Sequence, residues 1–187
     1  MTRRFFRLLA CQLLLLFACA QAQAADGVDI VDARIEASEE GYRLRATYAF
    51  DLNHGLEDAI QHGVTLSFTT EVELTRPRWY WYDDRAVTKS QTIRISYKVL
   101  TREYQVSVVG SMLQSFPTLD DAMVLIRRQS RWLIAPRGTL KLGENYQVTL
   151  RMFMDRELLP SPMKVSAFGN SQWRLESKDK KFQYRAE

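Results

Sequence analysis

Residues 64–74 read VTLSFTTEVEL, and this stretch shows most clearly which fold the chain adopts. Its apolar members are Val64, Leu66, Phe68, Val72 and Leu74, and the residues between them are polar. Successive side chains of a β-strand point to opposite faces, so this spacing gives one apolar and one polar face. It predicts a strand of an antiparallel sheet with one face buried in a core.

The same alternation recurs along the chain. It is regular at residues 42–50, 93–99, 104–108 and 146–154, and weaker at 28–37 and 173–177. Repeated alternation of this kind is typical of β-rich proteins. We therefore expect a mainly β fold.

Two short helices interrupt the strands. One is expected at residues 56–61, with Asn53 as its N-cap, and the other at 119–128, where Thr118 and Asp121 have capping-box spacing. The apolar side chains of the second helix are Leu119, Ala122, Met123 and Ile126. We interpret this stripe as core packing.

These elements predict a two-layer antiparallel β-sandwich, immunoglobulin-like, with the helices closing its ends or edges. The two helical segments lie 63 residues apart, each in a similar strand–helix–strand order. A ββαβ duplication is one explanation. Chance similarity between short amphipathic helices is the other.

The first 24 residues have the features of a secretory signal peptide. Three arginines (Arg3, Arg4 and Arg7) precede an apolar run at 8–20, and AQAA at 22–25 offers a small-residue cleavage site. We expect cleavage after Ala24 and a single β-rich envelope domain at residues 25–187, located in the periplasm.

Other interpretations of this segment remain open. Cys19 follows Leu16 and Ala18 in an arrangement related to lipoprotein signals, and TRRFFR at residues 2–7 is related to twin-arginine signals. An uncleaved signal would leave a membrane anchor. A tether through lipidated Cys19 or an uncleaved signal is thus the alternative to a free periplasmic domain.

The signal segment also changes what the composition implies. Both cysteines, Cys11 and Cys19, lie within it, so residues 25–187 offer no thiol for disulfides, catalysis or metal binding. Of the 26 basic residues it holds three, and of the 22 acidic residues none, which leaves residues 25–187 with a net charge of +1. We expect no nucleic-acid partner, because general polyanion binding then has no support in net charge.

The densest chemical feature of the chain is RPRWYWYDDR at residues 76–85. Aromatic and arginine side chains anchor many protein interfaces, and exposed aromatic rings also stack on sugars. The candidate binding residues are Arg76, Arg78, Trp79, Tyr80, Trp81, Tyr82, Asp83 and Asp84. The structural alternative is that Trp79 and Trp81 pack in the core while Tyr80 and Tyr82 cover a hairpin edge.

No arrangement of residues indicates catalysis. Asp83 and Asp84 are adjacent, and together with Asp58 they suggest an acid pair or a calcium site. In a strand the two neighbours would point opposite ways, and the chain has no D-x-D-x-D-G calcium loop. A hairpin turn between Tyr82 and Val87 explains Asp83 and Asp84 more simply. His54 and His62 lack the spacing of a zinc helix. We found no nucleophile elbow, phosphate loop or dinucleotide motif. We therefore expect no catalytic residue, metal or cofactor.

The chain resembles the DUF4390 family of exported proteobacterial proteins of unknown function. The matching segments are LEDAI at 56–60, GV at 63–64, ELTRPRWYWY at 73–82, Tyr97, LTREY at 100–104, SFPTL at 115–119, GENY at 143–146, Leu158, Pro160, Pro162 and Trp173. The resemblance implies an envelope location and one domain, but no assigned activity. Members of this family are encoded beside a membrane histidine kinase, so the resemblance also implies a signalling partner.

We expect a non-enzymatic envelope module that binds a protein partner in the envelope or membrane, with a link to a membrane sensor kinase. The alternative is a glycan or cell-wall-binding module that stacks sugar rings on residues 79–82.

Overall fold

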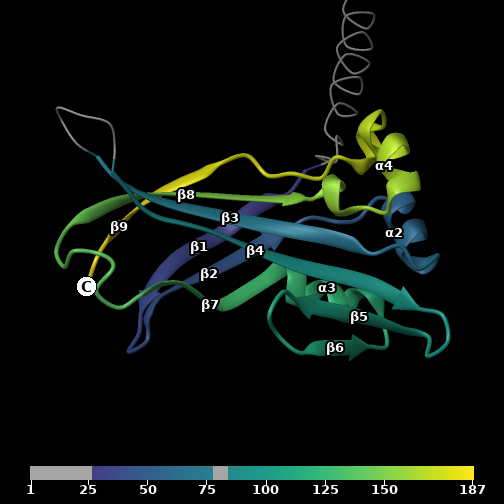
Figure 1. Cartoon of the computed structure of the whole chain (residues 1–187), viewed down its shortest axis with the longest axis horizontal. Helices are drawn as coiled ribbons and strands as arrows, with labels where there is room; N and C mark the ends of the chain where they lie inside the picture. Colours follow the sequence, from purple (N-terminus) through teal and green to yellow (C-terminus); the bar gives the residue numbers. More distant parts are fainter. Residues whose placement is uncertain (1–26, 78–83) are drawn as a thin grey trace, which may run out of the picture.

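The computed structural model describes residues 27–77 and 84–187, which form two antiparallel β-sheets. The strands are β1 (Asp29–Ala37), β2 (Gly41–Ala49), β3 (Leu66–Arg76), β4 (Asp84–Lys98), β5 (Glu103–Val108), β6 (Leu113–Phe116), β7 (Arg128–Pro136), β8 (Asn145–Met154) and β9 (Lys180–Arg185). The small sheet has the order β1–β2–β7 and the large sheet β6–β5–β4–β3–β8–β9 (Figure 1). The prediction of a mainly β fold with antiparallel sheets is confirmed.

The stretch that indicated the fold is β3, and it lies at the centre of the large sheet. It pairs with β4 along its whole length and with β8 along most of it. Leu66, Phe68 and Leu74 are fully buried, as the alternation predicts. Truncating such a side chain to alanine typically costs about 2–5 kcal/mol, so this inner face contributes strongly to stability.

The inner face of β3 packs against the small sheet. The hydroxyl of Tyr48, on β2, donates a buried hydrogen bond of 3.4 Å to Oγ1 of Thr70. The ring of Phe50, which directly follows β2, lies 5.7 Å from the ring of Phe68. These contacts join residues that are far apart in the sequence and make the two sheets one packed sandwich.

A lysine closes one side of the sandwich. The ammonium of Lys180, the first residue of β9, donates hydrogen bonds to the carbonyl oxygens of Ile30 (2.7 Å) and Val31 (3.1 Å) on β1. An isolated parallel bridge between Val28 and Ser177 adds a second connection nearby. The edge strands of the two sheets therefore lie against each other here.

Both predicted helices are present, and their predicted caps are confirmed. In α2 (His54–Gln61), the side chain of Asn53 accepts a hydrogen bond of 3.1 Å from the backbone N–H of Leu56. In α3 (Leu119–Arg127), Oγ1 of Thr118 accepts one of 3.2 Å from the backbone N–H of Asp121. Each cap satisfies a donor that the first helical turn leaves free.

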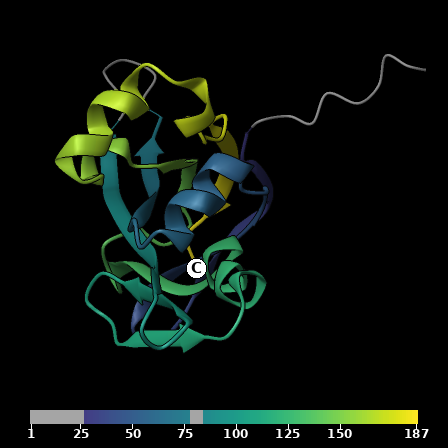
Figure 2. The same ribbon diagram turned by 90° about the vertical axis from the view of Figure 1, so that its right-hand side faces the viewer.

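The helices gather towards the end of the molecule that faces the viewer in Figure 2. There α3 contacts β2 and β7 of the small sheet and β5 and β6 of the large one. Its buried face consists of Ala122, Met123 and Ile126, so the predicted core role of its stripe is confirmed. Among the described residues, no helix is both long enough and apolar enough to span a bilayer.

The structure also contains elements that the sequence pattern did not predict. A further helix, α4 (Ser161–Phe168), accommodates Pro162 in its first turn, where a missing N–H costs nothing. Short 3₁₀ turns occur at Arg156–Leu158 (η1) and Ser171–Trp173 (η2). The sequence pattern did not reveal α4, because Pro162 and the weak amphipathic pattern of this segment hide it.

The strand β7 was missed because its alternation is broken. Opposite β2 it carries an extra residue at two places, and Arg131 has a left-handed backbone with φ of 66°. Each bulge shifts the following side chains to the other face. A strand with two such shifts shows no regular period of two.

The last predicted strand was placed wrongly. Residues 173–177 contribute only isolated bridges, from Glu176 to Phe153 and from Ser177 to Val28. The final strand is β9, which begins with Lys180 and Lys181.

The two strand–helix–strand units occupy different places in the topology. The helix α2 leads into β3 of the large sheet, whereas α3 leads into β7 of the small sheet. The unpredicted strand β7 thus separates α3 from β8 in the second unit.

Burial of Tyr48 predicts a loss of stability at alkaline pH. Burial raises the pKa of Tyr48 to about 12, and the hydrogen bond with Thr70 acts in the opposite direction. In the unfolded chain the pKa of Tyr48 is near 10, so the protonated Tyr48 hydroxyl makes its full contribution to the free energy of unfolding below pH 10. This contribution is lost as the pH rises from 10 through 12. The loss amounts to roughly 3 kcal/mol. Urea unfolding from neutral to alkaline pH should show a smaller decline for Tyr48→Phe than for the wild type, whereas parallel curves would contradict this prediction.

Candidate functional site

Two of the eight predicted site residues are described, and they form an ion pair at one end of the large sheet. Arg76 ends β3, Asp84 begins β4, and the two residues are opposite each other in the strand register. Nη2 of Arg76 donates to Oδ2 of Asp84 at 2.9 Å, with both side chains partly shielded from water. Next to it, Arg85 and Glu73 form a second pair at 2.9 Å. These pairs hold the ends of the two strands in register.

The position of Pro77 explains why β3 ends at Arg76. The proline directly follows Arg76, and β3 is a central strand that pairs on both sides. Proline has no N–H for a ladder, so it is excluded from such a position and follows the strand instead.

The other six predicted site residues lie outside the described residues. They are Arg78, Trp79, Tyr80, Trp81, Tyr82 and Asp83. Their role in binding a protein or a glycan, and the alternative of core packing, therefore stay predictions.

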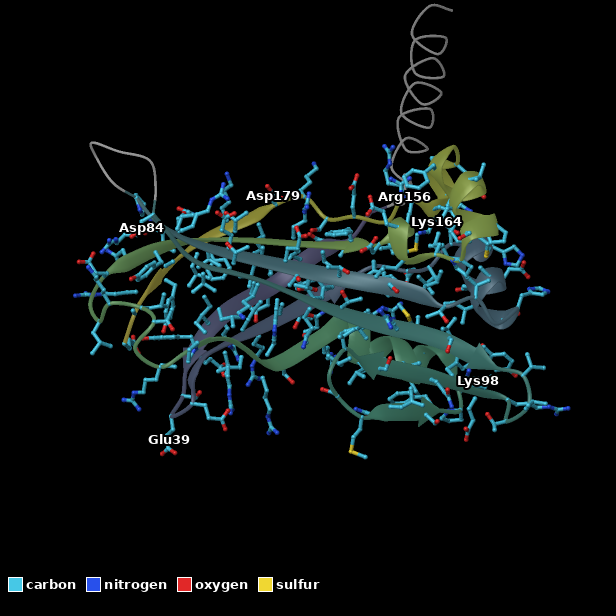
Figure 3. All side chains as sticks on the ribbon, in the orientation of Figure 1. Glu39, Asp84, Lys98, Arg156, Lys164 and Asp179 are labelled. Carbon is cyan, nitrogen blue, oxygen red and sulfur yellow. The ribbon has the colours of Figure 1, made fainter. Side chains whose placement is uncertain are left out.

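The carboxylates considered together in the sequence are not brought together. Asp58 lies on α2, and this helix contacts β4. The contact is at the C-terminal end of β4, because Gly63, which follows the helix, lies near the carbonyl oxygen of Tyr97. Asp84 is the first residue of β4 and Lys98 is the last, and the two lie at opposite ends of this strand (Figure 3). At the usual rise per residue, a strand of 15 residues extends over about 45 Å. Asp58 and Asp84 cannot act on one substrate atom.

The histidines have local structural contacts. His54 is the first residue of α2 and His62 is its C-cap. Nδ1 of His62 lies 2.8 Å from the carbonyl oxygen of Asp58 and 3.3 Å from its carboxylate. Within residues 27–77 and 84–187, no three histidine or carboxylate side chains gather as a potential metal site.

The outer face of the large sheet has two shallow hollows that share Glu71. One continues towards Phe153 and Phe168, and the other towards Thr88 and Asp179. The carboxylate of Glu71 accepts a hydrogen bond of 2.7 Å from Arg151, and this bond raises the pKa of the Arg151 guanidinium. The guanidinium also lies 5.0 Å from the ring centre of Phe153. The principal charges between the hollows therefore neutralise each other.

A different surface stands out at the opposite edge of the large sheet. The strand β6 pairs with β5 on one side, and no strand of the described chain pairs with its other side. Beside it, Met112 is 87% exposed, Val109 59% and Leu113 56%. We name β6 together with Val109 and Met112 the β6 edge. Exposed apolar side chains next to free backbone donors and acceptors are a combination that favours contact with another chain.

The remaining sheet edges are blocked. The bulges of β7, the left-handed Arg131 and the terminal Pro136 interrupt its outer side, and β1 and β9 are joined through Lys180. Bulges, proline and inward-pointing charges are the means by which proteins prevent strand addition. In the part of the chain that the structure describes, the β6 edge contains no charged residue, bulge or proline within its four-residue strand.

Sequence reasoning missed the β6 edge. Four residues are too few for a period of two to be recognised, and Leu113 and Phe116 give no alternation by themselves. The one available signal was the apolar pair Met112–Leu113, which follows the turn residues Gly110 and Ser111.

The ion pair between Arg76 and Asp84 should be measurable as a coupling energy. A cycle of Arg76→Ala, Asp84→Ala and the double variant should give about 0.5–1 kcal/mol at low salt, because the pair is only partly exposed. Added salt screens the two charges, so the coupling energy measured by urea unfolding should be smaller at high salt. A coupling energy of zero at low salt would contradict the prediction that the pair holds the strand ends together.

Comparisons with known proteins give one family. The family model DUF4390, described as a domain of unknown function, matches residues 25–183 and so covers nearly the whole chain. No curated protein and no solved structure matches the chain.

Proposed function

We propose that this chain, which belongs to the DUF4390 family, is an exported periplasmic module that binds a protein partner in the cell envelope and performs no chemistry of its own. The observation that carries this proposal is the β6 edge. An edge strand without blocking residues, flanked by exposed apolar side chains, supports binding of another polypeptide.

The chemistry of the β6 edge favours an extended segment as the bound element. In a strand, alternate residues direct their N–H and C=O groups to the same side, so a four-residue edge offers about two residues for new ladder bonds. Leu113, on the outer face of β6, would contact apolar side chains of the added segment. The partner element is therefore short, extended and apolar at alternate positions.

The sequence supports the proposed location and partner class. The arginine-rich start, the apolar run and the small residues before Ala25 support export. The resemblance to this family implies a membrane histidine kinase as a signalling partner, so the outer region of a sensor kinase is the first partner to test.

Site-specific photo-crosslinking in living cells tests the β6 edge. A photoreactive residue in place of Met112 should give one discrete protein adduct. The same residue in place of Val165 should not, although Val165, on α4, is similarly exposed at 82%. Adding Leu113→Asp should remove the adduct, because a carboxylate would have to be desolvated next to the partner.

Identification of the Met112 adduct by mass spectrometry then tests the partner. A sensor kinase would support the full proposal, and another envelope protein would support binding but contradict the kinase link. Equal adducts at Met112 and Val165, or none at Met112, would contradict the β6 edge as the binding surface.

N-terminal sequencing of the protein recovered from the envelope tests the export route. We expect the first residue to be Ala25, because signal peptidase cleaves after small residues in the A-x-A pattern. A chain that starts at blocked Cys19 or at Met1 would instead indicate a tethered protein.

A further inference from the structure

The outer face of the small sheet is unusually rich in arginine. The three strands β1, β2 and β7 contain Arg34, Arg43, Arg45, Arg128 and Arg131 and no lysine. Arg34, Arg43, Arg45 and Arg128 lie on the outer side, because their strand neighbours Ile35, Leu44, Ala46 and Gln129 are buried on the inner side. Arg131 lies in the β7 bulge opposite the outer-face residue Arg45, between the register pairs Leu44–Trp132 and Ala46–Gln129, and it is exposed there. We name these five arginines the arginine face.

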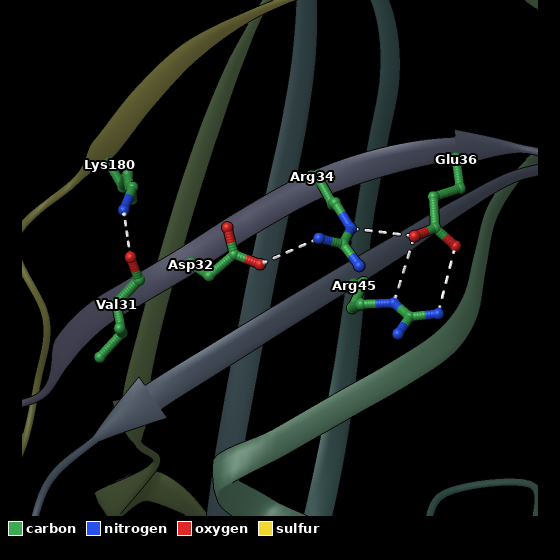
Figure 4. Close-up of polar contacts among 6 residues, drawn as sticks. All are labelled: Val31, Asp32, Arg34, Glu36, Arg45 and Lys180. Carbon is green, nitrogen blue, oxygen red and sulfur yellow. Dashed lines mark hydrogen bonds and ion pairs between the residues drawn. The ribbon is translucent and has the colours of Figure 1, made fainter.

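On the β1 side, the charges of this face are largely balanced. Arg34 and Arg45 are opposite each other in the register, which would be unfavourable for two like charges. Glu36 lies between them, with Oε1 2.9 Å from Nε of Arg34 and 3.3 Å from Nε of Arg45 (Figure 4). Its hydrogen bond with Arg34, opposed by a smaller effect of burial, lowers the pKa of Glu36, so this carboxyl is ionised at neutral pH.

The balance changes towards β7. Arg43 still forms an ion pair of 2.8 Å with Glu40, in the β1–β2 turn. Arg128 and Arg131 are exposed, and neither forms an ion pair with any described residue. The strand β7 contains no acidic residue. Positive charge therefore increases across the face from β1 to β7.

An apolar side chain accompanies these charges. Leu133 is 41% exposed and is opposite Arg43 in the register, so it lies on the same outer face. Guanidinium groups bind phosphate oxygens with two parallel hydrogen bonds, and a neighbouring apolar side chain can enter the acyl boundary of a bilayer. The combination of arginines with an exposed leucine therefore matches a phospholipid surface better than it matches free phosphate ions as the ligand.

The shape of the face also favours a surface over a strand. An acidic peptide could add to the sheet only along the outer side of β7, and there the two bulges and Pro136 interrupt the ladder. The helix that contacts this sheet, α3, buries Ala122, Met123 and Ile126 in the core. On the outer face, Arg34, Arg128, Arg131 and Leu133 are exposed, so this side of the sheet is open. A planar array of anionic groups can contact several of its arginines at once.

We propose that the arginine face docks onto a bilayer surface that contains anionic phospholipids, with Arg128 and Arg131 against the phosphodiester groups. This goes beyond the proposed binding of a protein partner and uses the other sheet. Each cation near an anionic bilayer contributes on the order of 1 kcal/mol, so several are needed for measurable binding.

Co-sedimentation with vesicles tests this inference. The protein is purified from the cell envelope with its natural N-terminus. It is then mixed with vesicles of phosphatidylcholine alone or of phosphatidylcholine with phosphatidylglycerol. We expect tighter binding to the anionic vesicles, and a decline of this preference as salt is added. The double substitution Arg128→Glu and Arg131→Glu should weaken binding to anionic vesicles by roughly tenfold or more.

A matched control separates this face from net charge. The double substitution Lys89→Glu and Arg94→Glu changes the charge by the same amount, but it lies on exposed positions of β4 in the other sheet. It should leave most of the preference in place. Equal losses in both double variants, or no preference for anionic vesicles in the wild type, would overturn the proposal.

Competition distinguishes the source of the anion. Inorganic phosphate should not displace the protein from the vesicles when it replaces chloride at constant ionic strength. Displacement by phosphate would overturn the proposal in favour of a small phosphate site, and stronger displacement by poly-L-glutamate than by an equal charge of anionic vesicles would overturn it in favour of an acidic protein partner.

Discussion

The inner face of β3, buried against β2, is the contact on which the other elements depend. Residues of β3 separate the two flanking strands β4 and β8, and its inner side chains meet Tyr48 and Phe50 of the small sheet. Hydrophobic burial provides the main stabilising free energy. The hydrogen bond between Tyr48 and Thr70 lets the one polar pair of this contact enter the interior without an unsatisfied hydroxyl. Once β2 and β3 are packed, the remaining strands extend the sheets on either side.

Sheet edges follow from this arrangement, because two open sheets have four of them. The edges formed by β1 and β9 are brought together, and Lys180 donates to backbone carbonyls of β1 across the junction. The outer side of β7 is interrupted by bulges and by Pro136. The strand β6 has only its short length to limit pairing, and this contrast is what gives the β6 edge its interest as a binding surface.

The β6 edge and the arginine face lie on different sheets and differ in chemistry. The first offers backbone groups and exposed apolar side chains, and the second offers guanidinium groups beside Leu133. A module with two such surfaces could hold a protein segment with one sheet while the other rests on a charged surface. The ion pair of Arg76 and Asp84 lies at neither of them.

Local sequence patterns determined the mainly β class, the inner and outer faces of β2, β3 and β8, and the caps of α2 and α3, because alternation and capping involve neighbouring residues only. They also marked Arg76 and Asp84, although not as partners of each other. Tertiary structure decided everything that depends on distant residues. It shows β7, whose two bulges occur where this strand pairs with β2. It also shows which sheet edges are blocked to the addition of another strand and which are open. It also shows how Arg43, Arg45, Arg128 and Leu133 come together on one face. Strand order sets these features, and strand order results from packing between residues far apart in the chain, which no local period records.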